Sequence, residues 1–133
     1  MSKNLKILGK LSLEVYEHLG GLNFDEKDFQ IALGCELTAK GIEYLREVHI
    51  ELYYKDVPIK LGAPDFYLNR EKPPAIIEIK LGSSLTNSNR QQLKMYLLSI
   101  KRNPKSVLKN VKNGILINFL KEDPTTYESV MVE

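Results

Sequence analysis

The sequence has little cysteine and no long apolar run. Cys35 is the only cysteine among 133 residues, which excludes an intramolecular disulfide and a zinc site built from cysteines. It falls in the middle of a predicted helix, where we expect it to be buried and inert. No apolar run reaches the roughly 18 to 20 residues of a membrane span, and the N-terminal segment mixes charged and apolar residues, unlike a signal peptide. We therefore expect residues 1–133 to form a single domain of an intracellular protein, cytoplasmic or associated with the nucleoid or nucleus, with no membrane contact.

Acidic residues are missing from one long segment. Residues 79–121 contain none of the 17 acidic residues and nine of the 19 basic ones, although the net charge is only +2. Such a segment predicts a polyanionic partner, and nucleic acid is the partner we expect. The alternative is a solvated helix face that is rich in lysine. The candidate nucleic-acid contacts are four basic residues of a helix predicted within this segment: Arg90, Lys94, Lys101 and Arg102.

The spacing of apolar residues predicts the helices and strands. Helical spacing predicts three helices, at residues 5–19, 25–40 and 90–102. Alternating or continuous apolar runs predict strands at residues 48–54, 59–68, 75–81, 114–120 and 127–132. The strand 75–81 is nearly all apolar and is expected at the sheet centre, whereas the strand 59–68 should bend near Gly62 and Pro64. This order predicts an α/β fold with a mixed central sheet flanked by helices and a helical crossover between two strands.

Two carboxylates and a lysine are predicted to lie together on the sheet. Glu78 and Lys80 are two apart in one strand, so their side chains point the same way, and a hairpin would bring Asp65 beside them. Charges on an apolar sheet are costly unless they are paired or functional. Asp65 and Glu78 could hold a magnesium ion, with a backbone carbonyl near Ile79 as a further ligand and Lys80 beside a water molecule. The alternative is a structural salt bridge between Lys80 and one of the acids.

Three further side chains could support this cluster. Glu26 shares a helical stripe with Phe29 and Leu33, so its carboxylate should point towards the sheet. An acidic residue in a first helical turn is also favoured without any such role. Gln92 and Tyr96 are four apart and share one side of the helix after the cluster. Gln92 could bind a metal-bound water or a phosphate, and Tyr96 could do the same or stack on a base, although simple packing would also explain both.

Together these residues resemble the signature of the PD-(D/E)xK nuclease superfamily. Pro64-Asp65 followed by Glu78-Ile79-Lys80 is similar to its central motif, and Gln92-Leu-Lys-Met-Tyr96 is similar to the Q-x-x-x-Y helix motif of its exonuclease-like and single-strand-processing branches. The closest resemblance is to the small GxxExxY proteins of that superfamily and covers about residues 5–120. It implies a restriction-endonuclease-like α-β-β-β-α-β core, dependence on Mg²⁺ or Mn²⁺, and hydrolysis of phosphodiester bonds.

The resemblance also implies roles for individual residues. Asp65 and Glu78 would bind the metal, Lys80 would be catalytic, and Gln92 and Tyr96 would support the site. Glu26 would be the helix glutamate of the GxxExxY motif.

The chain departs from that motif around the helix acid. Phe29 stands where the motif has tyrosine, Asn23 stands where it has glycine, and one extra residue lies between Gly20 and Glu26. Without that extra residue the glutamate position would fall on Asp25. We prefer Glu26 because its spacing to the following apolar stripe is kept.

The sequence thus predicts a metal-dependent nuclease with DNA, rather than RNA, as its expected substrate. A nucleic-acid-binding or assembly module that keeps the fold without cutting is the alternative. A homodimer would supply the two active sites needed to cut both strands of a duplex. The number of strands, the mode of cutting and the pathway stay open.

Overall fold

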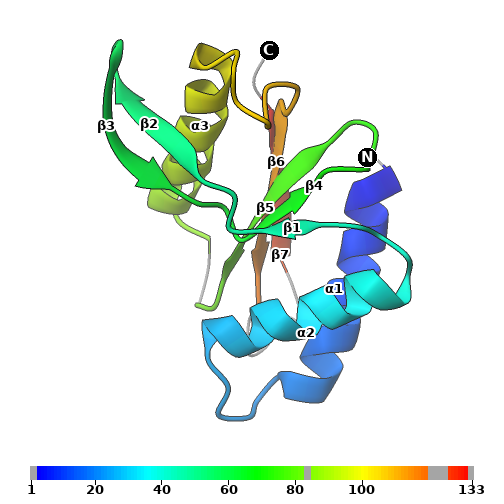
Figure 1. The fold of residues 1–133 in the computed structure, drawn as a ribbon. Helices are drawn as coiled ribbons and strands as arrows, with labels where there is room; N and C mark the ends of the chain where they lie inside the picture. Colours follow the sequence, from blue (N-terminus) through cyan, green and yellow to red (C-terminus); the bar gives the residue numbers. More distant parts are fainter. Residues whose placement is uncertain (1–2, 83–84, 120–125, 132–133) are drawn as a thin grey trace.

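The computed structural model of the chain describes residues 3–82, 85–119 and 126–131. Its elements, labelled in Figure 1, follow the order α1 (Lys3–Leu19), α2 (Glu26–Ala39), β1 (Leu45–Arg46), β2 (Ile50–Tyr54), β3 (Val57–Gly62), β4 (Phe66–Leu68), β5 (Ala75–Lys80), α3 (Asn87–Arg102), β6 (Asn113–Asn118) and β7 (Thr126–Met131). Among the described residues, none of the helices is long and apolar enough to cross a membrane.

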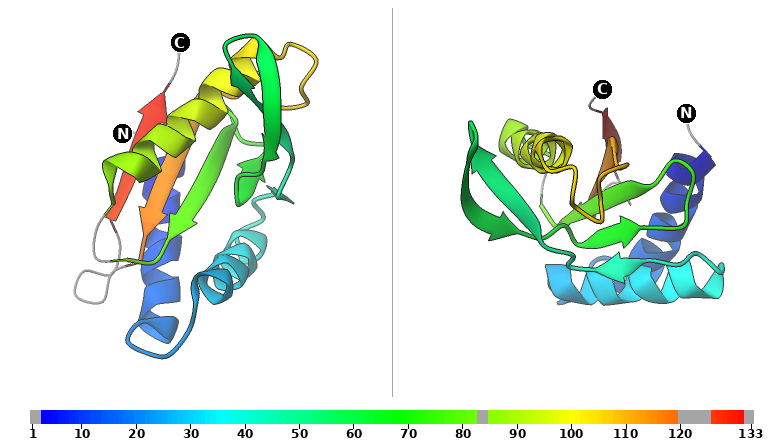
Figure 2. Two further views of the ribbon diagram at one scale, coloured as in Figure 1. Left: turned by 90° about the vertical axis from the view of Figure 1, so that its left-hand side faces the viewer. Right: turned by 45° about the horizontal axis from the view of Figure 1, so that its top comes forward.

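One mixed sheet forms the centre of the molecule. Its strand order is β1-β4-β5-β6-β7, and β2 and β3 form a separate two-stranded sheet. β5 and β6 run parallel and are joined through α3, whereas the other neighbours in the sheet are antiparallel. Figures 1 and 2 show α1 and α2 on one face of the sheet, with α3 and the β2–β3 hairpin on the other. The predicted α/β fold with a mixed sheet flanked by helices is confirmed.

β5 is buried on both faces, as its apolar sequence predicts. Ile77 and Ile79 belong to the core under α1 and α2, whereas Ile76 belongs to the core under α3 and the hairpin. This alternation follows from the two-residue period of a strand. Glu78 and Lys80 therefore lie on the α3 face of the sheet.

The predicted strand 59–68 is wrong as one element, because it forms two strands in different sheets. β3 ends at Gly62, and β4 begins at Phe66 in the five-stranded sheet. Pro64 lies between them and cannot donate a hydrogen bond to a ladder, which favours the break there. Asp65 therefore stands directly before β4.

Two local predictions are also corrected. Cys35 is exposed rather than buried, because it lies two residues from both Leu33 and Leu37 and so falls off the buried stripe of α2. The helix α3 begins at Asn87 rather than residue 90, because the Thr86 side chain accepts a hydrogen bond from the Asn89 N–H (3.1 Å) and caps it.

Candidate active site

The antiparallel pairing of β4 with β5 brings Asp65 beside Glu78. Phe66 pairs with Ile77, so the residues just outside this pair lie next to each other. The backbone N–H of Asp65 donates to Oε1 of Glu78 (2.9 Å), and the N–H of Ile79 donates to Oδ2 of Asp65 (2.7 Å). Each carboxylate is therefore held by the backbone of the other strand. Short bonds from backbone amides fix both carboxylates without neutralising either charge.

The surroundings of the two carboxyl groups disfavour their ionised forms. Glu78 is 5% exposed, and burial followed by the charge of Asp65 raises its pKa from 4.5 to about 8. Burial also raises the pKa of Asp65, although the hydrogen bond from Ile79 opposes this shift. Both directions show that the ionised forms are disfavoured in the metal-free protein. A cation between the carboxylates would reverse this.

Lys80 connects the carboxylates to α3. Its Nζ lies 3.8 Å from Oε2 of Glu78 and donates to Oε1 of Gln92 at 3.4 Å. Nε2 of Gln92 in turn donates to the hydroxyl oxygen of Tyr96 (3.2 Å). Tyr96 is buried, and this burial raises its pKa, followed by the charge of Glu78. The four residues form one chain of contacts, and the long distances at Nζ leave the ammonium weakly held.

Glu26, rather than Asp25, acts electrostatically on the carboxylate pair. The negative charge of Glu26, in the first turn of α2, is a smaller contribution that raises the pKa of both Asp65 and Glu78. Asp25 instead caps α2, because its side chain accepts the N–H of Asp28 (3.0 Å). The choice of Glu26 as the helix acid stays a prediction.

Sequence reasoning missed Arg46, which lies beside the pair. Its Nε donates to the backbone oxygen of Asp65 (2.9 Å), and its Nη2 donates to Oε1 of Gln30 (2.8 Å). The guanidinium also lies 4.6 Å from the centre of the Phe66 ring. The buried amide of Gln30 on α2 thus orients the Arg46 guanidinium, which in turn binds the backbone carbonyl of Asp65. A polar glutamine next to Phe29, on the buried side of α2, was the available sequence signal.

The four candidate nucleic-acid contacts are spread along α3 rather than gathered at the pair. Arg90 lies in the first turn and Lys101 and Arg102 lie in the last, roughly 17 Å apart along the axis. Nη1 of Arg102 pairs with Oδ1 of Asp56 (2.9 Å) at the tip of the β2–β3 hairpin. Lys94 is exposed between the two ends.

The donor set at the pair fits a magnesium ion. The described residues contain no group of three or more histidine, cysteine, aspartate or glutamate side chains placed to hold a metal. Mg²⁺ keeps several waters and is usually bound through one or two carboxylates, so Asp65 and Glu78 could supply the protein's share of its ligands. Their raised pKa values indicate that a hard cation would be favoured there. Ile79 contacts the pair through its N–H, and its carbonyl stays a predicted ligand.

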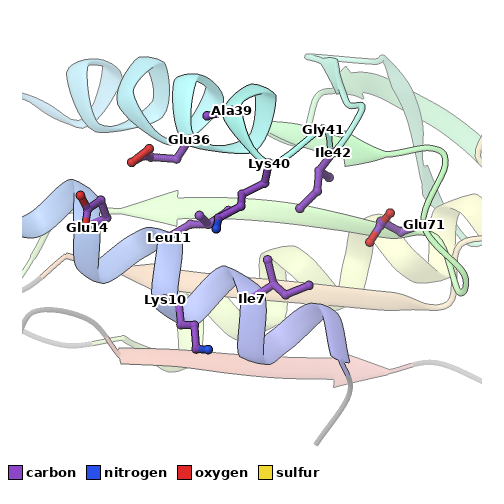
Figure 3. A pocket seen from close by; sticks show the side chains of 10 residues that line it. All are labelled: Ile7, Lys10, Leu11, Glu14, Glu36, Ala39, Lys40, Gly41, Ile42 and Glu71. Atoms are coloured by element: carbon purple, nitrogen blue, oxygen red, sulfur yellow. The ribbon is translucent and has the colours of Figure 1, made fainter.

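A large cavity lies away from the pair. It measures about 780 Å³ between α1 and α2, and Figure 3 shows Lys40 and Ile42 pointing into it from the end of α2. Its charged lining is mixed, with two lysines and three glutamates, and includes none of the predicted site residues. Cavity size therefore does not identify the site in this protein.

Comparisons with known proteins place the chain in a family. One solved structure, titled "Crystal structure of SSO0001", matches with 18% identity and a TM-score of 0.49, over 98% of this chain and 78% of that one. No curated protein matches the sequence. The family model of the PD-(D/E)XK nuclease superfamily matches residues 3–129. Proteins of this superfamily are generally nucleases, which act on nucleic acids and usually use divalent metals. Since the match spans nearly the whole chain, the protein belongs to the PD-(D/E)XK nuclease superfamily.

Proposed function

We propose that the protein is a metal-dependent nuclease that hydrolyses phosphodiester bonds in DNA. The observation that carries this proposal is the pairing of the half-buried Asp65 with the buried Glu78, two carboxyl groups that are costly to ionise without a cation and that lie beside Lys80. Mg²⁺ or Mn²⁺ at this pair would acidify a bound water and stabilise negative charge on the phosphate. Superfamily membership gives the reaction class, and the residue roles below are our assignment.

Each group around the pair has its own role in the proposed reaction. The backbone amides of Asp65 and Ile79 hold the two carboxylates in place, which keeps both groups oriented before substrate arrives. Lys80 is weakly held and partly exposed, so its ammonium can turn to the attacking water and to the phosphate oxygen that gains charge. Gln92 orients Lys80 through Oε1, and Tyr96 anchors Gln92. Glu26 adds negative charge near the pair, which strengthens cation binding.

The charge of the chain supports DNA as the substrate. Segment 79–121 carries no acidic residue, and α3 presents its basic side chains over its whole length. Neutralising phosphates with lysine and arginine gives an affinity that falls steeply with salt. A homodimer would place two such sites on a duplex, one for each strand.

A binding or assembly module without catalysis is the second candidate. The observation that favours it is the extension of the basic residues to Lys101 and Arg102, at the end of α3 far from Lys80 in sequence. In this case the protein binds nucleic acid in a salt-dependent way that EDTA does not change. The same experiment decides between the two.

The test is cleavage of end-labelled single- and double-stranded DNA and RNA with Mg²⁺, Mn²⁺ or EDTA. Wild type is compared with Asp65→Asn and Lys80→Ala, and with Lys10→Ala on the opposite face of the sheet as the matched control. Metal-dependent cutting that is lost in the first two variants and kept in the third supports the nuclease. Folded wild-type protein that binds nucleic acid and cuts no substrate under any of these conditions would support the binding module instead.

A further inference from the structure

A hollow of about 390 Å³ lies between β3 and α3 and borders the candidate active site. Gln92 and Tyr96 belong both to its lining and to the contact chain that ends at Lys80. A single side chain, that of Gln92, therefore spans the distance from the hollow to the ammonium. A ligand in this hollow would lie next to the side chain that contacts Lys80.

The walls of the hollow are apolar side chains that folding leaves in solvent. Leu61 of β3 is 59% exposed and Met95 of α3 is 45% exposed, and both line it. Flat aromatic rings gain contact with such side chains, and methionine sulfur is a favourable neighbour of a ring. The volume falls within the range of small-ligand sites, roughly 300 to 1,000 Å³.

Polar groups at the rim match a nucleotide. Ser88 and Gln91 supply a hydroxyl and an amide, which can donate to and accept from the edge of a base. Lys60 supplies a positive charge for a phosphate, and no acidic side chain is among the described lining residues. The large cavity between α1 and α2 has three glutamates in its lining and is unsuited to a polyanion.

Gly62 allows the strand and the helix to approach. A Cβ at this position would lie 2.8 Å from Cε1 of Tyr96 and 3.1 Å from Cδ1 of Leu52. The glycine therefore lets the end of β3 pack on Tyr96, the residue that anchors Gln92. Tyr96 thus lines the hollow and also anchors Gln92, the side chain that contacts Lys80.

We infer that this hollow binds an unpaired nucleobase of the nucleotide next to the scissile phosphate, so that the substrate class is single-stranded nucleic acid, a flap or a frayed end. This inference rests on the proposed nuclease function. A base within a duplex is stacked on both faces and paired along its edge, so only a base that has left the stack can enter such a site. Stacking on a protein side chain is possible for every base. We therefore expect the protein to prefer single-stranded over double-stranded substrate, without preferring one base sequence.

The test is a scan of a single-stranded oligonucleotide in which one abasic site is moved a nucleotide at a time. For wild type, the abasic site should lower kcat/KM by about 5- to 100-fold at one or two adjacent positions near the cut, the range expected when one stacked base is lost. Met95→Ala should lower kcat/KM on the intact strand and lose this position dependence. Leu98→Ala, which changes an exposed apolar residue of α3 outside the lining, should keep it. A flat profile for wild type, or the same profile for Met95→Ala, would overturn the inference.

A second readout needs no cleavage. 2-Aminopurine placed at each position of the same oligonucleotide should change its emission on binding in EDTA at one position with wild type, and less with Met95→Ala. This result separates the proposed base site from the proposed nuclease function. Protein that binds the base but cuts no substrate would contradict the nuclease function and leave the base site supported. Equal cleavage or binding of blunt duplex and single strand, with no position of altered emission, contradicts the hollow as a base site even if the nuclease is active.

Discussion

Replacing Glu78 with glutamine should make the metal-free protein more stable at high pH and abolish its activity. The pKa of Glu78 is about 8 in the folded protein, against 4.5 for the ordinary side chain. The native state therefore keeps a proton on Glu78 up to about pH 8, whereas the unfolded chain releases it near pH 4.5. The contribution of this group to the free energy of unfolding is complete below pH 4.5 and is lost as the pH rises to about 8.

The size of the effect follows from the two pKa values. The difference between 4.5 and 8 corresponds to about 5 kcal/mol at about 1.4 kcal/mol per pKa unit. This is an upper limit because Asp65 titrates together with Glu78. Glutamine stays uncharged and keeps an oxygen that can accept the Asp65 N–H. Without metal, Glu78→Gln should therefore be more stable than wild type by a few kcal/mol above pH 8, with little difference near pH 5.

Urea unfolding measures this difference, in EDTA and in Mg²⁺, at about pH 5 and about pH 8.5. Mg²⁺ should stabilise wild type at the higher pH and leave Glu78→Gln unchanged, and the variant should be inactive. Glu43→Gln is the matched control, because Glu43 is exposed and its pair with Arg70 contributes little. A Glu78→Gln variant no more stable than wild type at the higher pH in EDTA would refute the argument that ionising this carboxyl group is unfavourable.

Three further predictions concern the site and the core. Lys80→Ala should abolish cleavage while leaving the unfolding curve and Mg²⁺ binding largely intact, and wild-type activity in a cleavage assay would show that the site is wrongly assigned. Arg46→Lys keeps the charge but cannot bind the Asp65 carbonyl and the Gln30 amide at the same time. Its kcat/KM should fall about tenfold, and it should need more Mg²⁺ to reach half the maximal rate. An unchanged Mg²⁺ titration would contradict this. Ile77→Ala removes a fully buried side chain from β5 and should cost about 2–5 kcal/mol in urea unfolding, so a cost below that range would contradict its place in the core.

The parts of the fold that were predictable carry strong apolar patterns. β5 was identified because four of its six residues are apolar and three of these are isoleucine, which fits a strand covered on both faces. The juxtaposition of Glu78 and Lys80 followed from the two-residue period alone. Asp65 could be added because its strand pairs with β5 as an antiparallel neighbour.

The parts that were missed depend on tertiary contacts or on single side chains. β1 has two residues, too few for any period, and Arg46 within it is defined by partners on α2 and before β4. The break between β3 and β4 was read as a bend, because a sequence shows that Pro64 interrupts a ladder but not that the chain changes sheets. The first turn of α3 is polar and has no apolar residues at helical spacing, so the pattern did not show that the helix begins at Asn87. The Thr86 cap determines that start.

The electrostatics argue against a purely structural salt bridge at the site. A bridge that stabilises the fold lowers the pKa of its carboxylate, because the ionised form is favoured by its partner. The pKa of Glu78 is instead raised, first by burial and then by the charge of Asp65, and the ammonium of Lys80 at 3.8 Å offsets only part of this rise. Ionising Glu78 is thus unfavourable in the folded protein, and the metal-free fold loses stability as the pH rises towards 8. A divalent ion that binds the pair would remove this destabilisation, so the stability of the protein should report occupancy of the site.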